Sequence, residues 1–218
     1  MVLRPKRMEI DHRTIKLLVG LIAIGLPILT SAFAGCAITS ISASYYEGGW
    51  SESIFVGFLF AISAFLLAYN GRTRPEMILS KVGASAALGV ALFPCECGGH
   101  SALVPYVHGV SAAVMFLILA NFCRVFFDRA LQKGYPQAKV RAAVYAACGT
   151  AIVLAILALA FDHFSGGALS GWISSFVFYG ESVGLIAFGI SWLTASRTIP
   201  IITRRDERFS PLREDNPN

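Results

Sequence analysis

The sequence has few charged residues. Asp, Glu, Lys and Arg make up 14% of its 218 residues, whereas 56% are hydrophobic and the mean hydropathy is +0.65. A soluble globular domain has about 25% charged residues, because its surface is hydrated. The scarcity of charge excludes an ordinary soluble domain and predicts an integral membrane protein.

The sequence also lacks the period-two alternation of a transmembrane β-barrel. It contains long apolar stretches instead, and about 20 such residues in a helix cross a hydrocarbon core of about 30 Å. Six stretches are long enough: 15–38, 53–70, 78–94, 104–127, 138–161 and 172–196. The sequence therefore predicts an all-α polytopic membrane protein. Residues 15–196 form one six-helix bundle in this prediction, between an N-terminal tail (1–14) and a C-terminal tail (197–218). The stretch RRDERFSPLREDNPN (204–218) of this tail is expected to be loosely ordered.

Lys and Arg are absent from the first, third and fifth connections between these stretches. They gather in both tails and around the second and fourth connections. The positive-inside rule then places both termini in the cytoplasm. The net charge of +5 reflects this topology and contact with anionic lipid headgroups, not binding of nucleic acid. We expect the protein in the bacterial inner membrane.

The sequence has no HExxH motif and no paired CxxC motif, so common zinc signatures are missing. Histidine and carboxylate side chains nevertheless gather on the side predicted to face outward: His100, His108, His163, Glu96 and Asp162. They are ligand types for zinc or copper. We favour the alternative, in which they are solvated polar residues of the connections, and predict no metal cofactor.

Glu181 lies inside the last predicted span. If that span begins at Trp172, a rise of 1.5 Å per residue places Glu181 about 14 Å deep, near the middle of the bilayer. A carboxylate is costly there unless it is protonated, paired or beside water. Its expected partners are His108, Tyr179 and Ser182, in a polar pocket that opens outward. The alternative is a neutral Glu181 that hydrogen bonds across the bundle and only supports packing.

Three of the five cysteines, Cys36, Cys95 and Cys97, are expected at the outer ends of spans, where an oxidising compartment permits disulfides. A bridge between Cys95 and Cys97 closes a very small ring. We therefore expect Cys36 to pair with either Cys95 or Cys97, with free thiols as the alternative. Cys123 and Cys148 lie inside spans and are interpreted as small buried apolar residues.

Four stretches that cover most of the predicted bundle carry a resemblance: SISASYYEGGWSESIFVGFLFAISAFLLAYNG (40–71), GVALFP (89–94), HGVSAAVMFLILA (108–120) and ESVGLIAFGISWL (181–193). In them the chain resembles small bacterial membrane proteins of the Frag1/DRAM/Sfk1-like and DUF998-type families. The resemblance implies a six-helix bundle and a link to lipids. It implies no catalytic residues, and the CECGGH connection (95–100) has no counterpart in it.

These features favour a non-enzymatic membrane protein, either an accessory subunit of a larger membrane assembly or a lipid-binding protein. Its expected partners are membrane lipids and other membrane-protein subunits, and its expected ligand is a bound lipid. Two alternatives stay open. One is a metal-dependent intramembrane lipid hydrolase that uses His100, His108 and His163, and the other is a proton- or cation-coupled carrier that uses Glu181. Spans without a central Gly/Pro break disfavour the carrier.

Overall fold

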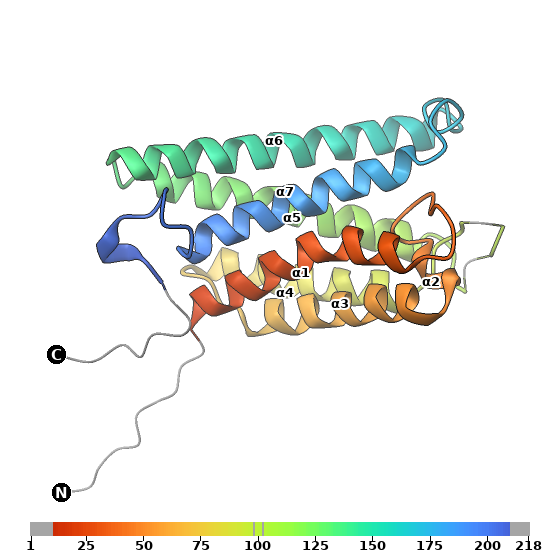
Figure 1. The fold of residues 1–218 in the computed structure, drawn as a ribbon, viewed down its shortest axis with the longest axis horizontal. Coiled ribbons are helices and arrows are strands. Elements are labelled where there is room, and N and C mark those ends of the chain that lie inside the picture. Colours follow the sequence, from red (N-terminus) through yellow and green to blue (C-terminus); the bar gives the residue numbers. More distant parts are fainter. Residues whose placement is uncertain (1–10, 98, 102, 210–218) are drawn as a thin grey trace, which may run out of the picture.

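The structure, a computed structural model, describes residues 11–97, 99–101 and 103–209, and these residues form helices and no strand. The helices are α1 (His12–Phe33), α2 (Ser44–Glu47), α3 (Gly49–Ala68), α4 (Arg74–Leu92), α5 (Val107–Leu131), α6 (Pro136–Phe164), α7 (Phe176–Ser196) and the 3-10 turn η1 (Arg205–Glu207). All the α-helices except α2 are long and apolar enough to cross a membrane. The predicted six-helix membrane bundle is confirmed (Figure 1).

Local signals explain where several helices begin. The Asp11 carboxylate accepts a hydrogen bond of 2.9 Å from the Arg13 N–H and caps α1, as short acidic side chains commonly do at helix starts. Pro75 and Pro136 lie in the first turns of α4 and α6, where proline lacks only an N–H that the helix does not use. The predicted spans agree with these helices to within a few residues.

The long helices form a closed ring. Each packs against its neighbours along the chain, and α1 packs against α7 (Figure 1). Gly20 and Gly189 permit this last contact, because a Cβ atom on Gly189 would lie only 2.7 Å from the Gly20 carbonyl oxygen. Gly184 likewise lets α7 pack closely against α5, because a Cβ atom on Gly184 would lie 2.3 Å from the Phe116 ring. Small residues thus allow close helix packing where no hydrophobic effect drives it.

Aromatic side chains fill the interior of the ring toward the C-terminal end of α7. The Trp192 side chain is fully buried. Its ring centroid lies between 5.2 and 5.9 Å from those of four neighbours: Tyr69, Phe122, Phe126 and Phe188. Tilted and edge-on aromatic pairs at these distances add to the packing energy. This aromatic cluster fills the interior of the bundle near the end at which α7 finishes.

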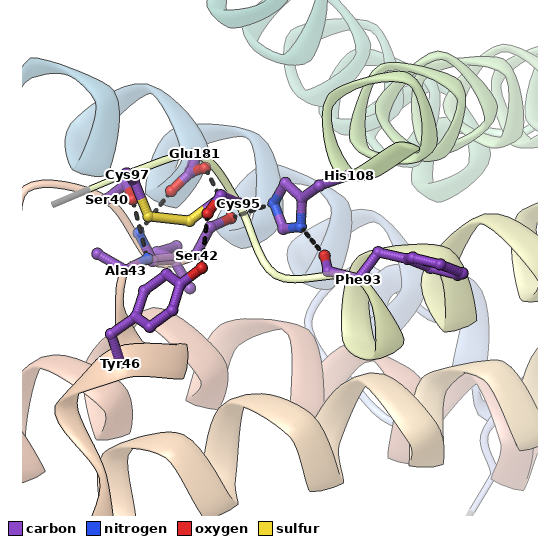
Figure 2. Close-up of a disulfide and its surroundings, with 10 residues drawn as sticks. Ser40, Ser42, Ala43, Tyr46, Phe93, Cys95, Cys97, His108 and Glu181 are labelled. Carbon is purple, nitrogen blue, oxygen red and sulfur yellow. Dashed lines mark hydrogen bonds between the residues drawn. A yellow bond between two sulfur atoms is a disulfide. The ribbon is translucent and has the colours of Figure 1, made fainter. Parts of the chain in front are cut away.

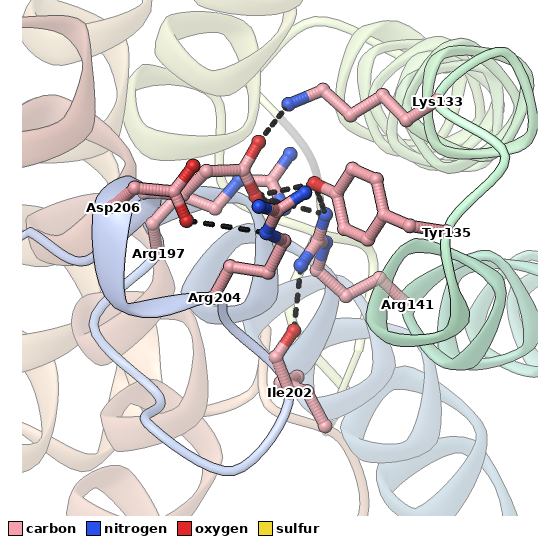
Figure 3. Close-up of polar contacts among 8 residues, drawn as sticks. Lys133, Tyr135, Arg141, Arg197, Ile202, Arg204 and Asp206 are labelled. Atoms are coloured by element: carbon pink, nitrogen blue, oxygen red, sulfur yellow. Dashed lines mark hydrogen bonds and ion pairs between the residues drawn. The ribbon is translucent and has the colours of Figure 1, made fainter.

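The described part of the C-terminal tail, residues 197–209, packs against the bundle, which corrects the prediction of loose order for residues 204–209; residues 210–218 lie outside the described residues. Figure 3 shows this segment against the buried side chain of Arg141, which donates hydrogen bonds to the Ile202 carbonyl at 2.6 Å and the Tyr135 hydroxyl at 2.7 Å. Arg141 also contacts Glu207 at 3.2 Å, and Lys133 forms an ion pair with the same carboxylate. A buried guanidinium needs such partners, so it holds the segment in place.

Glu207 makes the stability of this arrangement depend on pH. Burial raises the pKa of its carboxyl, but hydrogen bonds from Lys133 and Tyr135, together with the charges of Arg197 and Lys133, outweigh burial and lower the pKa to about 2. A lowered pKa contributes stability above the unfolded pKa of about 4.3, and this contribution is lost as the pH falls toward 2. We expect Glu207→Gln to cost about 1–2 kcal/mol at pH 7 after solvent screening.

Thermal unfolding in detergent between pH 7 and pH 3 checks this expectation. The melting temperature of the wild type should fall more steeply below pH 4.5 than that of Glu207→Gln. Asp206→Asn is the matched control, because Asp206 is exposed and pairs only with Arg204 among the described residues. Parallel pH profiles for wild type and Glu207→Gln would contradict the role given to Glu207.

Candidate functional site

One end of the bundle holds a chain of hydrogen bonds that runs from Glu181 to His108 (Figure 2). The Glu181 carboxylate accepts from the Ile41 N–H at 2.5 Å and from the Ser42 hydroxyl at 3.3 Å. The Ser42 hydroxyl also lies 2.9 Å from Nε2 of His108. The other ring nitrogen of His108 lies 2.7 Å from the Phe93 carbonyl oxygen and donates to it. We call Glu181, Ser42 and His108 the Glu181 cluster. It ties α7 and α5 to the connection between α1 and α2.

The structure brings only two of the four predicted pocket residues together. Tyr179 is 58% exposed and its ring packs beside Phe178. The Ser182 hydroxyl is buried and has no hydrogen-bond partner among the described residues. Neither side chain joins the Glu181 cluster, because consecutive residues of a helix point in different directions.

Glu181 lies near the start of its helix and not near the middle of the bundle. It comes five residues after α7 begins at Phe176, which is about 7.5 Å along the helix axis. The helix begins four residues after the expected Trp172, because residues 165–175 form turns. Gly166 and Gly167 have φ values of 71° and 88° in these turns, a region that glycine enters without steric cost.

The weak metal candidates, all of them described residues, do not form a metal-binding group. The Asp162 carboxylate accepts two backbone hydrogen bonds of 2.8 Å from the turn after α6. His100 stacks on Tyr46 with ring centroids 4.0 Å apart, and the side chains of His163 and Glu96 are exposed. Within residues 11–97, 99–101 and 103–209, no three His, Cys, Asp or Glu side chains lie close enough together to hold a metal ion.

The disulfide differs from the expected one. Cys95 is bonded to Cys97, so the expected pairing of Cys36 with either residue is wrong (Figure 2). The chain reverses after α4 and brings the Cα atoms of Cys95 and Cys97 within 5.4 Å, a separation that a disulfide spans. Cys36 lies elsewhere, with its Sγ atom 3.6 Å from a Glu47 carboxylate oxygen. The Cys95 carbonyl accepts a hydrogen bond of 2.8 Å from the Tyr46 hydroxyl.

The opposite end of the bundle contains a cavity of about 420 Å³. It lies among the start of α1, the α3–α4 connection and the C-terminal ends of α5 and α7. Its charged lining consists of six cationic and two acidic side chains: Arg13, Lys16, Arg72, Arg129, Lys133, Arg197, Asp11 and Glu207. We call it the basic cavity. Because cations outnumber carboxylates by four, it has the character of an anion-binding site.

The sequence prediction missed the basic cavity, because it interpreted these cations only as signals of topology. One local signal was present, since Arg13 and Lys16 are three residues apart and therefore share a face of α1. The other cations lie in the last turn of a helix or just after its end, in helices that are distant in the sequence. Only the closed ring brings them together.

Comparisons with family models, curated proteins and solved structures find no match to this chain. The fold class therefore rests on the structure itself. The resemblance to the Frag1/DRAM/Sfk1-like and DUF998-type families stays a prediction.

We expect substitution of Glu181 to lower the stability of the folded protein. In Glu181→Ala the Ile41 N–H loses its acceptor, and an unsatisfied buried donor costs about 1–3 kcal/mol. Glu181→Gln keeps one carbonyl oxygen and should cost less. Thermal unfolding in detergent measures both changes. Tyr179→Phe is the matched control and should melt like the wild type, because the exposed Tyr179 hydroxyl has no partner among the described residues. A Glu181→Ala protein as stable as the wild type would refute this structural role.

Proposed function

We propose that this multi-pass membrane protein is a non-enzymatic lipid-binding protein of the bacterial inner membrane, and that the basic cavity holds an anionic lipid headgroup. The observation that carries the proposal is the excess of positive charge in a confined space, where cations outnumber carboxylates by six to two. Crowded like charges destabilise one another in a medium of reduced dielectric constant. An anion that enters the cavity removes this repulsion.

Part of the positive charge is already compensated. Arg129 forms an ion pair with the buried Glu76, while Lys133 and Arg197 share Glu207. Arg13, Lys16 and Arg72 form no ion pair within the part of the chain that the structure describes. These three cations supply the charge available to a ligand.

An apolar groove beside the cavity supports a lipid as the ligand. This groove of about 500 Å³ lies between α5 and α6 and is lined largely by apolar side chains such as Leu117, Phe127 and Val153. Tyr145 lines both the groove and the basic cavity. A lipid has the matching chemistry, because its headgroup is charged and its chains are apolar. Arg124 at the groove adds a further positive charge.

The orientation of the bundle supports the same ligand. The positive-inside rule places the basic cavity on the cytoplasmic side. Anionic lipids give the cytoplasmic leaflet a negative surface potential, which attracts clustered Lys and Arg side chains. We therefore propose that both termini are cytoplasmic and that the Glu181 cluster and the disulfide face outward.

The hydrolase and the carrier are less well supported. Both need Glu181 or His108 free to act, whereas Glu181 accepts from the Ile41 N–H and His108 hydrogen bonds with Ser42 and the Phe93 carbonyl. Membership of a larger assembly stays a prediction, since the structure contains one chain.

Cys36 offers a direct test of orientation. It is exposed, while Cys123 and Cys148 are buried and Cys95 and Cys97 are bonded to each other. A membrane-impermeant maleimide should therefore label Cys36 in intact cells whose outer membrane has been permeabilised, and Cys36→Ser should remove the label. The Glu47 charge raises the pKa of the Cys36 thiol, so Glu47→Gln should speed labelling at pH 7. Labelling only after the inner membrane is broken would contradict the proposed orientation.

Lipid binding is tested by melting the purified protein in phosphatidylcholine nanodiscs with and without phosphatidylglycerol. The anionic lipid should raise the melting temperature of the wild type by several degrees, because ligands stabilise the state that they bind. Lys16→Gln should lose most of this rise. Lys139→Gln is the matched control, since exposed Lys139 lies at the same end of the bundle outside the cavity lining. No stabilisation of the wild type by anionic lipid would contradict the proposed function.

A further inference from the structure

Lys16 lines the basic cavity and lies beside two aromatic rings. Its ammonium group lies 5.4 Å from the ring centroid of Tyr69 and 5.2 Å from that of Phe126. Cation–π contacts of this kind stabilise an ammonium group without neutralising it. The side chain therefore places its amino group between two aromatic rings.

Four guanidinium groups repel a positive charge on Lys16. They are Arg129, Arg72, Arg197 and Arg13, and each interaction is repulsive. An ammonium group among four guanidinium groups is unfavourable unless an anion screens it. The described carboxylates do not do so, because Asp11 caps α1, Glu76 pairs with Arg129, and Glu207 is shared among Lys133, Arg141 and Arg197.

We infer that the basic cavity is a phosphomonoester site, in which Lys16, Arg13 and Arg72 bind a phosphate group that carries up to two negative charges. The inference rests on the proposed function and narrows its ligand class. A phosphodiester headgroup brings one negative charge, whereas a phosphomonoester near neutral pH brings between one and two, since its second pKa is about 6. Three cations that form no ion pair with a described carboxylate favour the more highly charged group.

The residue types also suit phosphate. The guanidinium fork matches two phosphate oxygens at once, and Lys adds a compact charge beside them. Arg13 and Lys16 come from the first turns of α1, and Arg72 comes from the α3–α4 connection, so the cations approach from two elements. A tetrahedral phosphate, which presents oxygens in several directions, can be bound from both sides.

The phosphomonoester can belong to a lipid headgroup or to a soluble molecule. Phosphatidate represents the first source and glycerol 3-phosphate the second. A cavity of about 420 Å³ is large enough for either phosphate-bearing group. Both ligands present the same phosphate group to the cavity. The competition experiment below distinguishes the lipid from the soluble molecule.

Native mass spectrometry of the full chain in detergent tests the inference by measuring dissociation constants for phosphatidate and phosphatidylglycerol with identical acyl chains at pH 7.5. We expect phosphatidate to bind about tenfold more tightly or better, which corresponds to about 1.4 kcal/mol. Lys16→Gln and Arg72→Gln should remove this preference, and Lys139→Gln should keep it. Arg72 is exposed in a turn, so its variant tests the site even if Lys16→Gln folds poorly.

Glycerol 3-phosphate is added in a competition arm. If it displaces phosphatidate at concentrations near its own dissociation constant, the phosphate alone is recognised and a soluble ligand is the source. If it does not compete, the acyl chains are needed and the source is a lipid. Both results support the phosphomonoester site.

Two results would overturn the inference. If phosphatidate and phosphatidylglycerol bind equally and Lys16→Gln weakens both equally, the cavity recognises anionic lipids in general. This result would support the proposed lipid binding and contradict the phosphomonoester site. If neither lipid binds more tightly than phosphatidylcholine, both fall together.

Discussion

The packing of α1 against α7 determines the geometry of both ends of this protein. The two helices are distant in the sequence, and their contact at Gly20 and Gly189 closes the ring of helices. Toward one end, this contact places Lys16 near Arg197. Toward the other end, it places Glu181 beside the residues that follow α1. A side chain at either glycine would force the helices apart and disturb both sites.

The two ends use polar groups in opposite ways. At the Glu181 cluster, the carboxylate and the imidazole bind backbone and hydroxyl groups of the same chain, so their hydrogen-bonding capacity is used within the fold. Buried polar groups that are satisfied in this way rigidify a structure. In the basic cavity, cations face one another, and three of them have no ion pair with a described carboxylate. An excess of one charge that the fold does not compensate is the expected feature of a binding site. This difference is the reason for assigning a structural role to Glu181 and a ligand to Lys16.

The features of the fold that can be predicted from the sequence are those encoded by local signals. Apolar stretches of sufficient length predict the six helices, and features such as the Asp11 cap and Pro136 lie near their starts. The start of α7 lies four residues later than predicted, because residues 172–175 form turns after Gly166 and Gly167 instead of a helix. The disulfide was missed because pairing depends on how the chain reverses after α4. The basic cavity was missed because its cations come from four places in the sequence, and topology alone is a sufficient reason for basic residues at helix ends.

We propose that positive charge left uncompensated in the basic cavity binds a phosphate-bearing ligand. The most direct test is native mass spectrometry of the protein extracted gently from the membranes in which it is made, followed by fragmentation of whatever molecule stays bound. We expect a phosphate-bearing molecule to stay bound to the wild type and to Lys139→Gln, and to be lost from Lys16→Gln. A wild-type protein that carries no such molecule, or a Lys16→Gln protein that carries the same one to the same extent, would contradict the account.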